Sequence, residues 1–140
     1  MSQDSLEELF RDDTEGVDEV HVLVVDDEEE IRELLSFKLG QHYSVATVSD
    51  GDACLDYLED PETLQPDIIT LDLMMPKVNG FEILELLDAH ARFKEVKPIV
   101  VSGLGGDDNL ARAFELGAAD FVRKPISFDE LAIRIERLLA

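Results

Sequence analysis

The sequence predicts an α/β fold with a five-stranded parallel sheet. Five short apolar runs, most of them rich in β-branched residues, alternate with stretches in which apolar residues recur at helical spacing. Short runs of this kind, followed by turn signals, are typical of strands buried on both faces of a parallel sheet. Alternating strands and helices imply right-handed crossovers, with helices on both faces of the sheet.

The expected strands are short and are spread along the whole chain. They cover His21–Val25, Tyr43–Val48, Asp67–Leu71, Val96–Val101 and Asp120–Arg123. Pro98 lies early in the fourth of these runs, where the loss of a backbone donor is tolerable.

Five helices are expected between and after the strands. They run from Glu28 to Leu39, from the Asp50-Gly51 turn to near Pro61, from the Asn79 cap to Ala91, from Asp107 to Gly117, and onward from the Ser127 cap. Apolar residues mark one face of each helix. These residues are Ile31, Leu34 and Leu35; Cys54 and Leu58; Phe81, Ile83, Leu84 and Leu87; Leu110, Ala111 and Phe114; and Leu131, Ile135 and Leu138.

Composition indicates one compact cytoplasmic domain. The chain has 140 residues, of which 45% are hydrophobic, and it contains neither a membrane-length apolar run nor a signal peptide. Cys54 is the single cysteine, so an intramolecular disulfide framework is ruled out. A buried structural thiol is the expected role for Cys54, in preference to a redox role.

The net charge of −21 is the unusual feature of the composition. The first nineteen residues hold eight acids and one base, and the remainder holds 25 acids and 11 bases. A negative field of this kind repels phosphates and argues against direct binding of nucleic acid. It also favours a salt-loving host, such as a halophilic archaeon, over an acidic regulator from a mesophile, because salt screens self-repulsion.

Four of the expected strands end in polar residues. These are Asp26 and Asp27, Asp72, Ser102 and Lys124. Because ligands bind beyond the carboxyl ends of parallel strands, all of these side chains are expected on one rim of the sheet. Three neighbouring carboxylates call for a divalent cation, and oxygen ligands favour Mg²⁺. A lysine and a hydroxyl beside them suit a transferring phosphoryl group, so the pattern predicts an aspartate phosphorylation site.

These motifs resemble the receiver domain of two-component response regulators. The resemblance rests on the Asp26-Asp27 pair, the segment from Asp72 to Gly80, the Ser102-Gly103 pair and the Lys124-Pro125 pair, and it extends from about His21 to Ala140. It implies a flavodoxin-like, doubly wound sheet with strand order 2-1-3-4-5. It also implies a phosphoacceptor that is loaded by a histidine kinase, a histidine phosphotransfer protein or a small donor such as acetyl phosphate, with Mg²⁺ or Mn²⁺.

The resemblance assigns a role to each residue on the rim. Asp72 is the implied phosphoacceptor. Asp27 and the main-chain carbonyl of Met74 are implied direct metal ligands together with Asp72, while Asp26 acts through water or by orienting the ion. Capping of the following helix is an alternative, compatible role for Asp27. Lys124 is expected to pair with Asp72 before reaction and then with phosphoryl oxygens, and its bond to Pro125 is expected to be cis.

Further residues are implied in switching and in tuning the lifetime of the phosphoryl group. Ser102 moves toward the phosphoryl group and Phe121 then shifts inward, although a plain core role for Phe121 is an equal alternative. Met74 and Leu104 are apolar where fast-cycling relatives carry polar residues, so slow phosphate loss is expected. The implied readout face comprises the helix from Asp107, the strand from Asp120 and the last helix. A downstream protein target would use this face, and a homodimer formed on phosphorylation is a further expectation.

Other classes of protein fit the pattern less well. A haloacid-dehalogenase-type phosphatase needs an acid two residues after its nucleophile, where this chain has Met74. The acidic rim would repel the phosphate of a flavin nucleotide, and the intact rim argues against a degenerate docking receiver. We therefore expect a signalling phosphoacceptor rather than an enzyme, limited to self-phosphorylation and slow self-dephosphorylation.

Residues 1–20 form an acidic arm that precedes the expected receiver domain, residues 21–140. Its charge favours a disordered tail. The alternative is a short amphipathic helix, with Leu6, Leu9 and Phe10 on one face, that docks on a partner or on the receiver. The sequence leaves open the cognate kinase, the target, the input signal, the oligomeric state, and whether the chain stands alone or is part of a longer regulator.

Overall fold

The computed structural model describes residues 19–103 and 106–140, and it confirms the predicted architecture. Five parallel strands form one sheet in the order β2-β1-β3-β4-β5. The strands are β1 (His21–Val25), β2 (Ser44–Val48), β3 (Ile68–Leu71), β4 (Lys97–Ser102) and β5 (Asp120–Arg123). Each strand boundary lies within about one residue of its predicted position, since β-branched runs bounded by turns are strong local signals.

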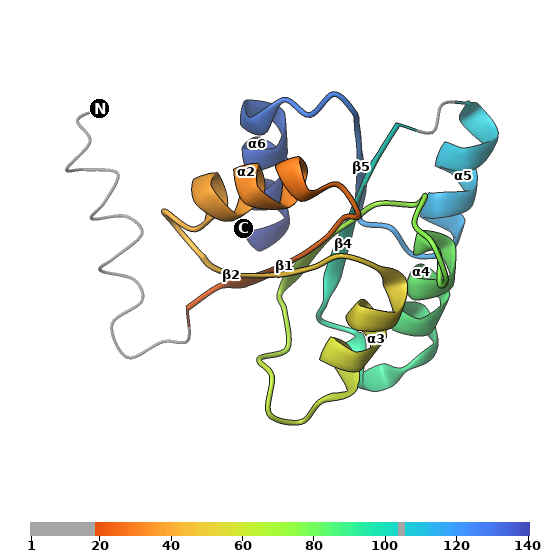
Figure 1. Ribbon diagram of the computed structural model, residues 1–140. Coiled ribbons are helices and arrows are strands. Elements are labelled where there is room, and N and C mark those ends of the chain that lie inside the picture. The colour runs from red at the N-terminus through yellow and green to blue at the C-terminus, as the bar shows by residue number, and fades with distance from the viewer. Residues whose placement is uncertain (1–18, 104–105) are drawn as a thin grey trace.

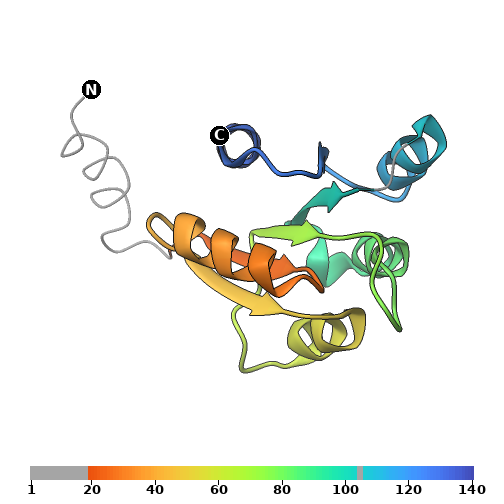
Figure 2. The same ribbon diagram turned by 45° about the horizontal axis from the view of Figure 1, so that its top comes forward.

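The helices lie on both faces of the sheet. Figures 1 and 2 show α2 and α6 on one side and α3, α4 and α5 on the other. Their bounds are α2 (Glu29–Leu39), α3 (Gly51–Glu59), α4 (Gly80–Ala89), α5 (Asp107–Glu115) and α6 (Phe128–Leu139). The predicted caps are confirmed, because Asn79 accepts a hydrogen bond from the backbone N–H of Glu82 and Ser127 accepts one from that of Glu130. The α4 helix ends earlier than predicted, at Ala89, and His90 is extended before the short 3₁₀ helix η2 (Ala91–Phe93).

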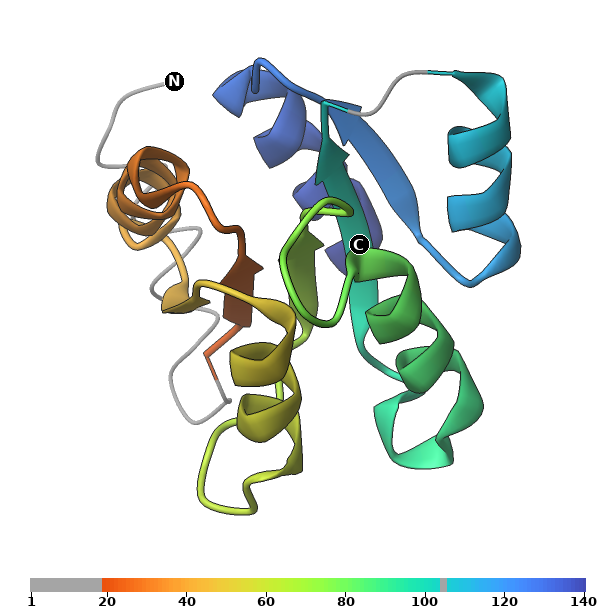
Figure 3. The same ribbon diagram turned by 45° about the vertical axis from the view of Figure 1, so that its right-hand side comes forward.

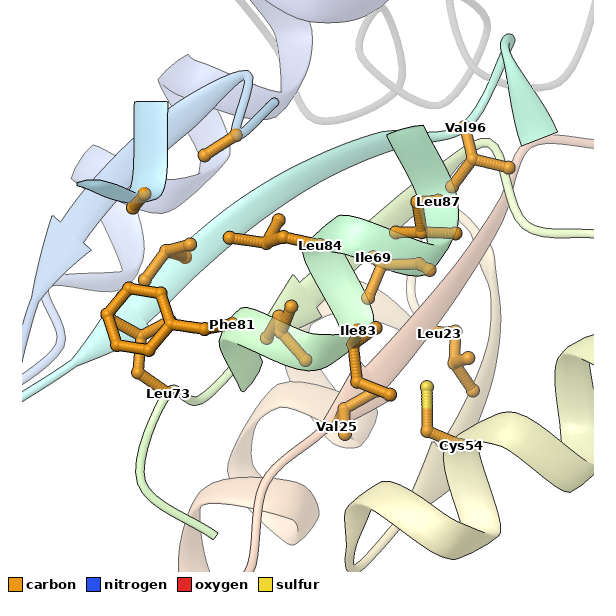
Figure 4. Packing of buried hydrophobic residues seen from close by; sticks show 14 of the residues in the cluster. Leu23, Val25, Cys54, Ile69, Leu73, Phe81, Ile83, Leu84, Leu87 and Val96 are labelled. Carbon is orange, nitrogen blue, oxygen red and sulfur yellow. The ribbon is translucent and has the colours of Figure 1, made fainter. Parts of the chain in front are cut away.

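Two hydrophobic cores hold the helices against the sheet. Alternate residues of β1 point to opposite faces, so Leu23 and Val25 enter one core and Val22 and Val24 the other. Figure 4 shows the first core, where side chains of the sheet meet those of α3 and α4. Cys54 is fully buried there, and burial raises the pKa of its thiol to about 12, which agrees with a structural role.

Two helices turn a different face to the core than the spacing suggested. Leu34 of α2 is 43% exposed, while Leu35 and Leu39 are buried one turn apart. In α5, the predicted residues Ala111 and Phe114 are exposed, Phe114 to 44%, and Ala113 is buried instead, since the small alanine lets the helix approach the sheet. Leu34 and Phe114 each lie directly beside a buried residue, so in both helices the buried face is rotated by about one residue from its predicted position.

Polar groups inside the fold are satisfied. Across residues 19–103 and 106–140, every buried side-chain nitrogen or oxygen has a hydrogen-bond partner. Within the same ranges, no helix has the length and apolar character needed to cross a membrane.

Candidate functional site

The register of the sheet brings four strand ends to one rim. Val25 of β1 lies beside Leu71 of β3, and the backbone N–H of Asp72 donates to the carbonyl of Val25. At the other side of β3, Ser102 of β4 lies beside Arg123 of β5, and the N–H of Lys124 donates to the carbonyl of Ser102. The residues that follow these strands therefore meet, as the sequence predicted.

Three carboxylates gather at this rim. Asp26, Asp27 and Asp72 each present an oxygen atom, and these atoms lie within 4.8 Å of one another. Asp26 and Asp72 are buried, with 2% and 4% of their surfaces exposed, while Asp27 is exposed. Carboxylate oxygens in such a group suit a hard divalent cation, which would offset their mutual repulsion.

Backbone amides orient the two buried acids. Oδ1 of Asp26 accepts a hydrogen bond from the N–H of Glu28 at 2.9 Å, and Oδ1 of Asp72 accepts one from the N–H of Met74 at 3.1 Å. The N-cap of α2 is Glu28, which makes no side-chain cap bond, so the proposed capping role of Asp27 is wrong. Asp27 is turned to solvent instead and remains available to a ligand.

Lys124 is the cation at the centre of the site. Its ammonium lies 3.0 Å from Oδ2 of Asp26 and 3.3 Å from Oδ2 of Asp72. The predicted pairing with Asp72 is therefore present, and the Lys124–Pro125 peptide bond is cis. Glu28 also contacts Lys124, at 2.5 Å, and sequence reasoning missed it. The run of five acids after β1, residues 26–30, contained the signal, because its third member, Glu28, is near enough to reach the same cation.

The environment of the site destabilises its negative charges. Burial raises the pKa of Asp72 to about 6, against the opposing effects of the Met74 N–H and the Lys124 ammonium. Burial likewise raises the pKa of Asp26. Burial disfavours the charged form of Lys124 too, but hydrogen bonds to Glu28 and Asp26 and the charge of Asp72 outweigh it and raise its pKa. At neutral pH one ammonium thus faces ionised acids that burial has made more basic, which is a setting that favours a further cation.

The remaining predicted residues lie around this centre. Ser102 is 1% exposed at the end of β4, and Phe121 is 8% exposed within the core that contains α3, α4 and α5. Phe121 is thus already inward in this structure. The side chain of Met74 is 60% exposed on the loop after Asp72, and Leu104 lies outside the described residues.

Comparison with known proteins agrees with this geometry. A family model described as the response regulator receiver domain matches residues 22–136. The chain belongs to this family. It is therefore a receiver domain of the two-component response regulator type, a family of signalling domains.

Relatives and solved structures extend the comparison. The chain is 33% identical over 119 residues to the phosphate regulon transcriptional regulatory protein PhoB of Klebsiella pneumoniae, covering 84% of this chain and 51% of PhoB. It is 38% identical over 122 residues to response regulator RR06 of Streptococcus pneumoniae, covering 86% and 53%. The receiver domain of the Francisella response regulator 1452 superposes with a TM-score of 0.75 at 29% identity, covering 85% and 95%. The chain thus spans about half the length of these curated relatives and nearly all of the isolated receiver domain.

Membership of the family gives the acidic rim a context. Receiver domains bind Mg²⁺ through an acidic pocket and interact with histidine kinases and downstream effectors. Among residues 19–103 and 106–140, the group of Asp26, Asp27 and Asp72 is the acidic cluster available for that purpose. The donor set fits the ion, since all three groups are carboxylates and two of them are buried acids with raised pKa values.

Proposed function

We propose that this receiver domain accepts a phosphoryl group on Asp72. One observation carries the proposal: the carboxylate of Asp72 is buried at a strand end, 3.3 Å from Lys124 and grouped with two further acids. Asp27 would hold Mg²⁺ directly together with Asp72 and the Met74 carbonyl, and Asp26 would orient the ion. Mn²⁺ would suit the same oxygen ligands.

The chemistry proposed for Asp72 is a displacement at phosphorus. A carboxylate oxygen attacks the phosphorus of a phosphohistidine or of acetyl phosphate, and the bond from phosphorus to the donor's nitrogen or oxygen breaks. Lys124 neutralises charge on the transferring oxygens, which is the usual source of rate in such reactions. Bound Mg²⁺ would supply further neutralisation of the same oxygens. The Met74 N–H keeps Oδ1 of Asp72 in place, so that the carboxylate meets the donor in one orientation.

The conformational response is proposed to start at Ser102. The hydroxyl of Ser102, buried at the end of β4, would move to the phosphoryl oxygens. Because Phe121 already lies inward, phosphorylation would stabilise that position rather than create it. The readout face would comprise α5, β5 and α6, where Arg134 of α6 donates two bonds of 2.8 Å to Asp120 of β5. A downstream protein or a second copy of the chain would bind there.

The wider setting of the domain is part of the proposal. The match to this chain covers only about half the length of the relative named as a transcriptional regulatory protein, and the acidic surface makes nucleic acid an unsuitable direct partner for the receiver itself. The same charge supports a salt-rich cytoplasm as the location. The domain boundary proposed at residues 20 and 21 agrees with the start of β1, but both interpretations of the arm fall mostly on residues 1–18, outside the described part.

Turnover of a foreign phosphoester is not part of the proposal. The position two residues after Asp72 is held by Met74, whose exposed thioether cannot act as a general acid or base. Incubation with a generic phosphoester should therefore release no phosphate beyond the rate of a buffer blank.

Labelling with a small donor tests the proposal directly. After incubation with acetyl phosphate and Mg²⁺, the parent should gain one phosphoryl mass and Asp72→Asn should gain none. Asp107→Asn, which changes an exposed acid at the start of α5, is the matched control and should be labelled like the parent. Labelling of Asp72→Asn to the parent's extent would refute the assignment.

A further inference from the structure

The first residue of α3 is in tight contact with the loop that follows Asp72. A Cβ atom added to Gly51 would lie 1.9 Å from the carbonyl oxygen of Val78 and 2.6 Å from the Cβ of Val78. The φ angle of Gly51 is outside the left-handed region, so its backbone conformation does not call for glycine. Glycine is required there because any side chain would push the loop away. Figure 3 shows this loop, between β3 and α4, curving down to the first turn of α3.

A second contact ties the same loop to the same turn. Lys77 has a left-handed backbone, with φ of 67°, and its ammonium lies 3.9 Å from Asp50 and 4.0 Å from Asp52. Asp50 is itself held as the N-cap of α3, where it accepts a bond of 2.8 Å from the N–H of Ala53. Such exposed ion pairs are weak individually, but both of them draw Lys77 toward residues 50–52.

The other side of the loop is attached to Asp72. The N–H of Met74 donates to Oδ1 of Asp72, and the N–H of Gly80 donates to the carbonyl of Leu73 at 3.1 Å. A Cβ on Gly80 would lie 2.5 Å from the carbonyl oxygen of Asp72, so this side is packed without spare room. Because the loop is closely packed on this side, a displacement of Val78 would be transmitted along the loop to Met74.

We propose that Gly51 is a positioning residue for the phosphorylation site. Its missing side chain lets α3 support Val78 and Lys77, and the supported loop holds the Met74 amide on Asp72 and the Met74 carbonyl toward the metal. The inference rests on the proposed function, because the metal and Asp72 give the loop its role.

Gly51→Ala tests the role of the contact. Mg²⁺ affinity, measured by titration of the metal alone, should fall by about tenfold or more, as for other groups that support a metal ligand. Phosphorylation by acetyl phosphate should need correspondingly more Mg²⁺ yet approach the parent's rate at saturation. In the metal-free protein the amide resonances of Met74 and Gly80 should shift.

Gly40→Ala is the matched control for a loss of stability alone. A Cβ on Gly40 would lie 2.4 Å from the carbonyl oxygen of Ser36, so this substitution is also crowded, but Gly40 caps the distal end of α2. It should lower the melting temperature and leave Mg²⁺ affinity at the parent's value. Equal Mg²⁺ affinity of folded Gly51→Ala and the parent would overturn the proposal.

Lys77 provides a milder pair of variants in case Gly51→Ala fails to fold. Lys77→Gly accepts the positive φ without strain and removes both ion pairs, so Mg²⁺ affinity should fall roughly twofold to fivefold. Lys77→Arg keeps a cation at this position and should retain the parent's Mg²⁺ affinity. No difference between these two variants would overturn the proposal. If the parent is labelled on Asp72 while these variants behave like the parent, only the positioning role fails. If the parent neither binds Mg²⁺ nor is labelled, the proposed function fails and the positioning role falls with it.

Discussion

The ammonium of Lys124 lies 3.3 Å from Oδ2 of Asp72 and joins two loops that are 52 residues apart in the chain. The same ammonium contacts Asp26 at 3.0 Å, so one cation serves two buried acids. Burial of the acids raises their pKa values and the cation opposes this rise. The site therefore holds Asp72 ionised at neutral pH by a narrow electrostatic balance.

Removal of the cation should upset this balance. In Lys124→Met the pKa of Asp72 should rise further above about 6, because burial would act without an opposing ammonium. Phosphorylation by acetyl phosphate should slow by about a hundredfold, the usual cost of losing one such electrostatic partner. Carboxyl resonances followed against pH in metal-free protein would measure the first effect. Lys94→Met, at an exposed lysine, is the control, and an unchanged Asp72 titration in Lys124→Met would contradict the argument.

Metal affinity should depend strongly on Asp27. Asp27→Ala removes an exposed carboxylate from the group of three, and Mg²⁺ affinity should fall at least about tenfold, with slower phosphorylation. Asp107→Ala also removes one exposed acid but leaves the rim intact, so its Mg²⁺ affinity should equal that of the parent. Calorimetric titration with Mg²⁺ would separate these cases. Equal affinities for Asp27→Ala and the parent would rule out the carboxylate site.

The phosphorylated state should persist for many minutes or longer. Hydrolysis needs a water molecule in line with phosphorus, and the side chain of Met74, 60% exposed beside Asp72, offers that water no hydrogen-bond donor. One orienting hydrogen bond is worth about 1–3 kcal/mol, so Met74→Asn should speed phosphate loss roughly tenfold to a hundredfold. Decay of the phosphorylated protein after removal of the donor measures this directly. Loss within seconds in the parent, or no acceleration in Met74→Asn, would remove the apolar-side-chain explanation.

Stability should rise with salt. The net charge of −21 spreads like charges over the surface, and at about 1 M salt they are screened beyond about 3 Å. The melting temperature should therefore be higher in molar KCl than in dilute buffer. Sucrose at matched osmolality, which does not screen charge, gives the control for a solvent effect. A melting temperature that is flat across the KCl series would leave the high-salt host without support.

Stability should also fall with acid through His21. Its ring is buried at the start of β1, between the hydroxyls of Ser44 at 2.9 Å and Tyr57 at 2.6 Å. Burial lowers the pKa of His21 below its ordinary 6.5, against the charge of Asp67. The imidazole of His21 therefore binds a proton more readily in the unfolded chain than in the folded one. The contribution of neutral His21 to the free energy of unfolding is present above pH 6.5 and is lost as the pH falls below this value.

A difference measurement isolates this contribution from the acids of the rim, whose raised pKa values act in the opposite sense. The free energy of unfolding should fall less steeply below pH 6.5 in His21→Gln than in the parent. His90→Gln, at an exposed histidine, should keep the parent's slope. A parent-like slope in His21→Gln would show that His21 does not carry the effect.

The sequence by itself determined the order of the elements and the membership of the rim. Strand runs and helix caps are local patterns, and parallel strands place their carboxyl ends at one edge of a sheet. Asp26, Asp72 and Lys124 could therefore be grouped from their positions in the chain alone.

Only the tertiary structure decided which groups touch across long separations. The contact of Glu28 with Lys124 joins residues 96 apart, and the approach of Val78 to Gly51 depends on how the loop after β3 folds over α3. Likewise Leu34 is exposed and Phe121 is inward because of helix rotation and packing against neighbouring elements. Local periodicity specifies which face of an element is apolar to within about one residue, whereas distances between elements arise from packing of the whole chain.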